Sequence, residues 1–315
     1  MKNKAKYLII FFTYFILIIY SLELLLFIFA PKTQKDLVKV DEIRLSRAKE
    51  LGLNYDLRSR SEAFLEEEKK NANLAPVFYF NNKFSRFKYF NKAITNNNLM
   101  PFRGPINKQT LSCTEDFQYR IINNDQIGFK NPNSIYEKKI DIAILGDSYA
   151  EGLCYKEKND IAGNLRKLNY NTANFGVTGS GPLVALGVFN EYVKAYKPKI
   201  VIYLYFEGND ISDLNWERDN TNLTKYLDND YSQNLMLRKK EIEIFLNELS
   251  KESYNYLRQI ADINKNYGSE KNKKILEQII DILELTRLKY AIKNISYLVY
   301  DKEFDKDLFF SIFDQ

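Results

Sequence analysis

The sequence of 315 residues contains no histidine and only two cysteines. The absence of histidine removes the side chain that most often takes the proton from a catalytic serine. Without histidine, a zinc site would have to rely almost entirely on carboxylates, so we expect no metal. Nothing in the sequence implies an organic cofactor, and we expect none. Basic tracts interleaved with aromatic residues are absent too, and the net charge is only +5. The sequence therefore gives no support for nucleic-acid binding.

The two cysteines are Cys113 and Cys154. In an oxidising compartment, two cysteines and no others suggest a single disulfide. Such a bond would close a loop of about 40 residues and stabilise the fold by roughly 3–4 kcal/mol through chain entropy. The alternative is a pair of unrelated buried thiols.

One long apolar stretch lies near the N-terminus, at residues 7–30. It contains a single charge, Glu23, and as a helix it would cover roughly 36 Å, enough to span a bilayer. A signal-peptide core is shorter, about 7–15 residues, and ends in small residues before the cut. Because Ile28 and Ala30 make a poor cleavage site, an uncleaved anchor is favoured over a cleaved signal peptide.

The charges that flank this stretch do not fix its orientation. Three lysines within residues 1–6 favour a cytoplasmic tail, but basic residues also follow the stretch. A long domain can be translocated despite its charges. We therefore expect a single-pass membrane protein with its main domain on the periplasmic or extracytoplasmic side.

Residues 31–137 predict a membrane-proximal lead-in region and not a separate enzyme. Its first part is charged and favours a helix over residues 40–52, which Gly52 could close, and another over residues 55–70. Short strand candidates follow at residues 74–80 and 119–129.

From residue 138 the apolar pattern predicts an α/β domain that extends to residue 315. Strand, helix, strand, helix and strand alternate, which is typical of a parallel sheet flanked by helices. Pro182 suits the first turn of the second helix. Residues 214–300 favour a mostly helical insertion. The five expected elements are residues 140–146, 161–168, 171–176, 181–199 and 199–210.

The sheet predicted from these strands is small. Doubly wound sheets commonly carry about five strands. The third strand, at residues 199–210, is apolar on both faces, so we expect it to be buried on both and to need neighbours at its edges. Residues 305–315 resemble a helix start without a glycine cap. We therefore expect that the natural protein continues beyond Gln315.

A polar loop follows each of the three strands: GDSYAEG from residue 146, NFGVTGSG from residue 174 and FEGND from residue 206. The carboxyl ends of parallel strands meet at one edge of a sheet, where active-site loops gather. Each loop alone also has a plain structural explanation, because such residues form tight turns and cap helices. The occurrence of all three at successive strand ends favours a functional site.

Together the three loops resemble blocks one to three of the SGNH, or GDSL, hydrolases. The matches are Gly146-Asp147-Ser148 in block one, Gly179 in block two and Gly208-Asn209-Asp210 in block three. The resemblance implies a parallel-sheet, three-layer α/β/α fold of the flavodoxin-like kind.

The resemblance extends beyond these blocks. It covers most of the chain from about Tyr55 to Tyr300 and is to membrane-anchored bacterial members of the family. Those relatives also pair a cysteine before block one with another just after it, which supports the pairing of Cys113 with Cys154.

The resemblance implies a role for each matched residue. Ser148 would be the nucleophile. The backbone N–H groups of Ser148 and Gly179 and the side-chain amide of Asn209 would form the oxyanion hole, with Asp147 and Asp210 as supporting residues. Donors fixed in advance stabilise the negative oxygen of a tetrahedral intermediate, each by roughly 2.7–4 kcal/mol.

The last block of the family, Asp-x-x-His, has no match. Asp301 and Asp305 lie near the end of the chain without an imidazole, and no Ser-x-x-Lys arrangement begins at Ser148. A missing base costs about 10²–10⁴ in rate. The 315 residues are therefore expected to be nearly inert as a hydrolase.

Three functional hypotheses follow. The first is an incomplete membrane-anchored serine esterase or O-acyltransferase, whose acyl-ester substrates, by location and analogy, are O-acyl groups of envelope glycans or lipids. The second is a non-catalytic binding or scaffold protein of the cell envelope with the same fold. The third is a structural envelope protein whose motifs are coincidental.

Overall fold

The computed structural model describes residues 2–29, 40–80, 99–114, 117–266, 282–283, 285, 287–289 and 312. The chain forms two compact units, residues 1–47 with 262–305 and residues 48–261 with 306–315. Most of residues 267–300 of the expected helical insertion lie outside the described residues, as do Asp301 and Asp305.

The first unit contains helix α1 (Lys2–Phe29), which begins earlier than the apolar stretch itself. Its segment Ile10–Ile28 has a mean hydropathy of 2.3 and is long and apolar enough to cross a membrane. The one charge within it, Glu23, is fully buried, and its carboxylate accepts the backbone N–H groups of Arg287 at 3.0 Å and Leu288 at 2.8 Å. These bonds satisfy a carboxylate that would be costly in an apolar environment.

Helices α3 (Val40–Glu50) and α4 (Arg60–Glu68) confirm the two helices expected before residue 70. Gly52 follows α3 with a φ of +65°, a conformation that glycine adopts without strain. At the start of α4, the Ser59 hydroxyl accepts the N–H of Glu62, and the Glu62 carboxylate accepts the N–H of Ser59. This capping box explains why the helix begins there.

Two small antiparallel sheets precede the parallel one. Their strands are β1 (Phe78–Tyr79) paired with β2 (Arg103–Gly104), and β3 (Gln109–Leu111) paired with β4 (Ile121–Asn123). β1 and β4 lie within the two strand candidates. Phe80, Met100 and Phe102 are buried in the same apolar core as the parallel sheet. Much of the expected lead-in region, from residue 48, thus belongs to one compact unit with that sheet.

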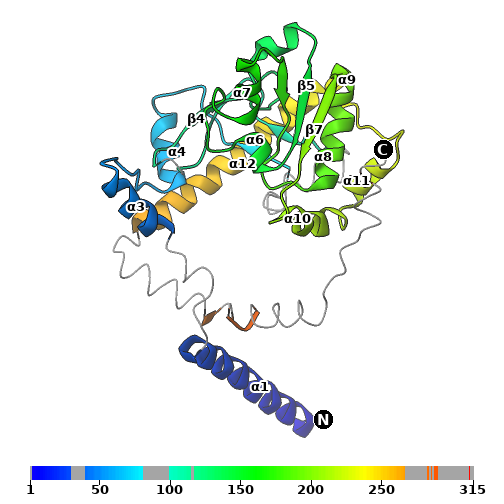
Figure 1. The fold of residues 1–315 in the computed structure, drawn as a ribbon. Helices are drawn as coiled ribbons and strands as arrows, with labels where there is room; N and C mark the ends of the chain where they lie inside the picture. The colour runs from blue at the N-terminus through cyan, green and yellow to red at the C-terminus, as the bar shows by residue number, and fades with distance from the viewer. Residues whose placement is uncertain are drawn as a thin grey trace. The chain divides into compact units, whose positions relative to one another are not determined.

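The three predicted strands form one parallel sheet in the order β6-β5-β7 (Figure 1). They are β5 (Ile142–Gly146), β6 (Thr172–Asn174) and β7 (Ile200–Leu204). The central strand β5 is buried throughout. β7 lies at the edge of the described sheet, where Ile200 and Val201 are exposed. The expectation that this strand is buried on both faces is therefore wrong for these two residues, because no described strand covers them.

Helices cover both faces of the sheet, because side chains alternate along β5. Ile142 and Ile144 pack with residues of α6 (Ser148–Glu151) and α7 (Ile161–Lys167). Ala143 and Leu145 belong to the core that includes α8 (Pro182–Val188). The chain is therefore a mixed α/β fold, as expected. The α8 helix continues through the π-helical turn η3 (Phe189–Val193) and α9 (Lys194–Tyr196).

After the sheet the described chain is largely helical, as expected, and α12 (Lys239–Asn266) is its longest element. Ile242, Phe245 and Leu249 of α12 are buried at helical spacing, and the Phe245 ring lies 5.7 Å from that of Phe78 in β1. The other elements are η2 (Asn133–Glu137), α10 (Asp210–Glu217), α11 (Thr221–Thr224), η4 (Lys225–Leu227) and η5 (Leu235–Leu237).

Cys113 and Cys154, which lie 41 positions apart in sequence, form a disulfide with their Cα atoms 5.3 Å apart. Next to it, the Ser112 hydroxyl donates a hydrogen bond to the carbonyl oxygen of Leu153. The bond ties the segment after β3 to the segment after α6. This is the pairing expected from the sequence.

Replacing both Cys113 and Cys154 by alanine should lower the free energy of unfolding by about 3–4 kcal/mol, because the unfolded chain loses the restraint of a long loop. Urea unfolding followed by circular dichroism measures the change. The wild type in the presence of a reductant should behave like the variant. Equal stability of the oxidised wild type and the variant would contradict this role.

Candidate functional site

The carboxyl ends of β5 and β7 lie side by side, with Gly146 paired to Leu204. After β5 the chain passes to α6 and α7 on one face, whereas after β7 it passes to α10, which packs against α8 on the other face. In α/β proteins, ligands commonly bind at the strand ends where the connections diverge in this way.

Asp147 and Ser148 directly follow the carboxyl end of β5. The Asp147 Oδ1 atom accepts the N–H of Tyr149 at 2.8 Å and so caps α6. Its Oδ2 atom lies 3.5 Å from the Ser148 Oγ atom. Asp147 is buried, whereas Ser148 is partly exposed. Gly146 has a φ of +138°, and a Cβ atom there would lie 2.6 Å from the Leu204 carbonyl oxygen, so only glycine fits this turn.

The side-chain amide of Asn209 reaches the same carboxylate. Its Nδ2 atom donates to Asp147 Oδ2 at 3.3 Å and to Asp213 Oδ2 at 2.9 Å. The Ser148 hydroxyl and the Asn209 amide therefore lie within reach of one oxygen atom, and the structure brings the two predicted residues together. Asn209 occupies the N-cap position of α10 but makes no side-chain capping bond, so capping does not account for its side chain.

The loop that contains Gly179 lies beside these residues. The N–H of Val177 donates to the carbonyl oxygen of Gly146 at 2.9 Å. A Cβ atom on Gly176 would lie 2.3 Å from the backbone nitrogen of Glu151, so the loop packs directly on α6. Gly179 has a φ of +73° and is partly exposed. The three loops predicted from the sequence thus adjoin one another.

Asp210 supports the turn after β7. It is fully buried, and its Oδ2 atom accepts the Tyr203 hydroxyl at 2.9 Å and the N–H of Phe206 at 3.0 Å. Burial, reinforced by the negative charge of Asp147, raises the pKa of Asp210 to about 6. Its role in the structure is to hold the backbone that presents Asn209.

Glu217 is a site residue that the sequence did not reveal. This carboxylate from the end of α10 is fully buried and accepts the N–H groups of Gly181 at 2.5 Å and Leu183 at 2.9 Å. It thereby caps α8 and fixes the end of the Gly179 loop. Burial raises the pKa of Glu217 to about 8, although the backbone hydrogen bonds oppose that shift. A glutamate in an ordinary helical stretch carries no sequence signal for this role.

The residues predicted to contact the substrate differ in exposure from the two supporting carboxylates. Ser148, Gly179 and Asn209 are each partly exposed, whereas Asp147 and Asp210 are buried beneath them. A ligand can therefore contact the three former residues and not the two carboxylates. Beside them, the ring of Tyr149, which is exposed, lies 4.4 Å from that of Phe206.

The chain has no histidine to take the Ser148 proton. A buried lysine, Lys130, lies near α6, but its Nζ atom donates to the carbonyl oxygen of Gly152 at 2.6 Å and pairs with Asp160 at 3.1 Å. Among the described residues no group of three or more acidic or cysteine side chains could hold a metal ion. The site therefore offers a hydroxyl and hydrogen-bond donors without an imidazole.

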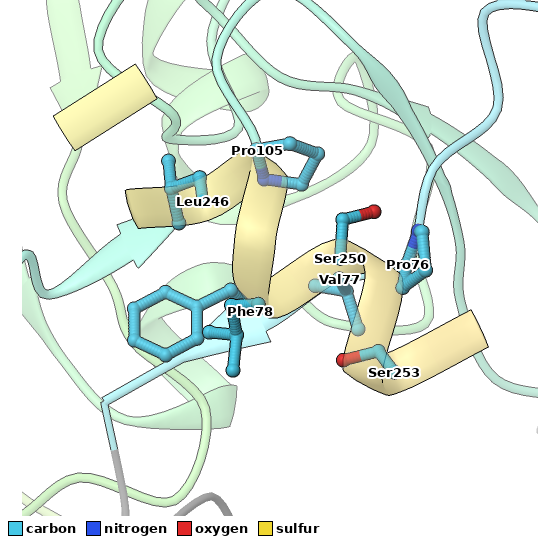
Figure 2. Close-up of a pocket in the computed structure, with 8 residues that line it drawn as sticks. Pro76, Val77, Phe78, Pro105, Leu246, Ser250 and Ser253 are labelled. Atoms are coloured by element: carbon cyan, nitrogen blue, oxygen red, sulfur yellow. The ribbon is translucent and has the colours of Figure 1, made fainter. Parts of the chain in front are cut away.

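Three cavities in the described part of the second unit are lined by other residues than Ser148, Gly179 and Asn209. One of about 350 Å³ lies between α12 and the segments at residues 72–75 and 105–108. Figure 2 shows the small pocket next to it, where Leu246, Ser250 and Ser253 of α12 face Pro76 and Pro105. Another, of about 290 Å³, is apolar and lies between α8 and the β7 edge.

No protein-family model matches this chain, and no curated protein or solved structure matches it. The case for function therefore depends on the motifs and on the geometry of the three loops.

The raised pKa of Glu217 predicts a pH-dependent stability. Between its ordinary pKa of 4.5 and about 8, the folded protein holds a proton that the unfolded chain has released, so the free energy of unfolding falls as pH rises across this window and is level above it. Glu217→Gln removes the titrating group. Urea unfolding from about pH 5 to about pH 9 should show a steeper fall for the wild type than for the variant, and parallel curves would refute the shift.

Proposed function

We propose that this chain is a membrane-anchored protein of the SGNH hydrolase type, with Ser148 as a nucleophile toward acyl esters. The observation that carries the proposal is the meeting of the Ser148 hydroxyl and the Asn209 amide at one oxygen of Asp147. Asp147 and Asn209, 62 positions apart, are brought together at the carboxyl ends of two parallel strands. Three structural turns with unrelated purposes would not require this convergence.

The proposed reaction is acyl transfer. The Ser148 Oγ atom forms a bond to the ester carbonyl carbon, and the carbonyl oxygen becomes an oxyanion. Because the chain has no histidine, the Ser148 proton passes to solvent water or to an added base such as imidazole. The N–H groups of Ser148 and Gly179 and the amide of Asn209 stabilise that oxyanion. Collapse of the intermediate breaks the ester bond, and the alcohol leaves with a proton. The acyl group then passes to water in a hydrolase, or to a sugar hydroxyl in a transferase.

For this step the Asn209 amide has to turn from a carboxylate toward the oxyanion. Its bond to Asp147, at 3.3 Å, is the longer of its two bonds, while Asp213 holds it at 2.9 Å. Exchange of the longer bond for one to a full negative charge is favourable, because hydrogen bonds to charged acceptors are the stronger kind. The Asp213 bond keeps the amide oriented meanwhile.

The compartment and the substrates follow from two features. The segment Ile10–Ile28 of α1 would anchor the chain as a single-pass protein. The Cys113–Cys154 disulfide supports an oxidising compartment, hence the periplasmic or extracytoplasmic side. Esters within reach there are O-acyl groups of envelope glycans or lipids. A non-catalytic binding protein is the second candidate, favoured by the absence of histidine.

A fluorophosphonate probe should label Ser148, and added imidazole should accelerate the labelling. In that reaction Oγ binds phosphorus, fluoride leaves and imidazole takes the proton that no histidine of the chain can accept. Mass spectrometry of the peptide that contains residue 148, from the full chain in detergent, measures the rate. Ser148→Ala should show no label, and Asn209→Ala should slow labelling by about 10²-fold or more.

The outcome that contradicts the proposal is equally clear. If folded wild-type chain stays unlabelled at residue 148 with imidazole present, or if the Asn209→Ala variant reacts at the wild-type rate, the nucleophile and the oxyanion hole are refuted. The non-catalytic candidate would then stand.

The anchor has its own test. The full chain, expressed in a bacterium, should remain in the membrane pellet after carbonate extraction, and a chain without residues 2–30 should appear in the supernatant, because about 19 apolar residues are enough to hold a helix in a bilayer. Protease added to spheroplasts should digest the main domain. A protected domain would refute the sidedness, and an extractable full chain would refute the anchor.

A further inference from the structure

We propose that Glu151 is a positioning residue that fixes the Gly179 loop against the helix of Ser148. This inference rests on the proposed function, because it concerns the placement of one oxyanion donor. Glu151 lies three residues after Ser148, at the end of α6. The Glu151 side chain is buried, whereas Ser148 is partly exposed.

One carboxylate oxygen of Glu151 holds the loop. Its Oε2 atom accepts the N–H of Thr178 at 3.1 Å and the Thr178 hydroxyl at 2.5 Å. Thr178 directly precedes Gly179, so both bonds act one residue away from the proposed oxyanion donor. The near contact of Gly176 with the Glu151 backbone holds the other side of the same loop.

The second carboxylate oxygen is held in turn by the lead-in region. Its Oε1 atom accepts a hydrogen bond from Arg103 Nη2 at 2.7 Å, within a buried ion pair, and another from the Tyr79 hydroxyl at 3.1 Å. Tyr79 belongs to β1 and Arg103 to β2. A rigid connection therefore runs from the first small sheet through Glu151 to the residue before Gly179.

The negative charge of Glu151 is what this connection requires. Arg103 is buried, and its Nε and Nη1 atoms have no hydrogen-bond partner among the described residues. Burial is the largest influence on the pKa of Arg103 and would lower it, but the charge of Glu151, together with smaller contributions from Tyr79 and Asp125, raises that pKa overall. A neutral side chain at position 151 would leave a buried cation without its counter-charge, and the network would rearrange.

A small rearrangement there is enough to affect the reaction. Oxyanion donors act within about 2.7–3.1 Å of the developing charge. A displacement of about 1 Å can cost about 10²-fold in rate. The position of the Gly179 N–H therefore depends on Glu151, although Glu151 itself touches neither substrate nor oxyanion.

Two substitutions test this coupling in the full chain in detergent. Glu151→Gln keeps the shape and removes the charge, and Thr178→Val removes only the hydroxyl bond. With imidazole present, each should slow fluorophosphonate labelling of Ser148 in the folded protein, Glu151→Gln by about tenfold or more. Because both act on one contact, the double variant should slow labelling by less than the product of the two single effects, and slowing equal to that product or greater would refute a shared path.

Glu191 provides a matched control. It is a buried carboxylate on η3 that accepts hydrogen bonds from Tyr226, Ser232, Gln233 and Leu235, away from the three loops. Glu191→Gln should therefore lower the melting temperature as Glu151→Gln does, yet leave the labelling rate of the folded protein unchanged.

The outcomes separate the two proposals. Suppose that the wild type is labelled. If folded Glu151→Gln is then labelled at the wild-type rate, or if Glu191→Gln slows labelling equally, only the role of Glu151 is overturned and the proposed function stands. A wild type without label would overturn the proposed function and this inference with it. If Glu151→Gln does not fold, Thr178→Val carries the test, and its labelling at the wild-type rate would overturn the inference.

Discussion

The carboxylate of Asp147 is the group on which the arrangement of the site depends. It is buried at the end of β5, and a buried carboxylate is costly unless hydrogen bonds surround it. One of its oxygens caps α6 and the other accepts the amide of Asn209, so the need to satisfy this single group ties the loop after β5 to the loop after β7. Glu151 of α6 and Glu217 of α10 act in the same way. Each is a buried carboxylate that accepts a backbone N–H at one end of the Gly179 loop.

This arrangement explains why polar residues gather where an apolar sheet ends. β5 supplies the rigid base, because every one of its side chains is buried between helices. The loops at its carboxyl end are also fixed by carboxylates that accept backbone N–H groups. The lead-in region takes part in the same network, because Arg103 and Tyr79 both bind Glu151. The expectation of a separate membrane-proximal lead-in region did not include that role.

Much of the fold could be predicted, because long apolar runs bounded by turn residues show their period in the sequence. β5, α7, β6, α8 and β7 all fall within the segments expected for them. β2 and β3 could not be predicted, because Arg103–Gly104 and Gln109–Leu111 do not lie in an apolar run. The convergence of Ser148 with Asn209 followed from the rule that parallel strands end at one edge. The roles of Glu151 and Glu217 did not follow, because their loop partners Thr178 and Gly181 lie 27 and 36 positions away in sequence.

A crystal structure of the phosphonylated full chain would test the central claim most directly, since the probe leaves a phosphoryl oxygen where the oxyanion would form. The account predicts that oxygen within about 2.7–3.1 Å of the Asn209 Nδ2 atom and of the backbone nitrogens of Ser148 and Gly179. A phosphoryl oxygen directed into solvent, with the Asn209 amide still bound to Asp147 and Asp213, would contradict it.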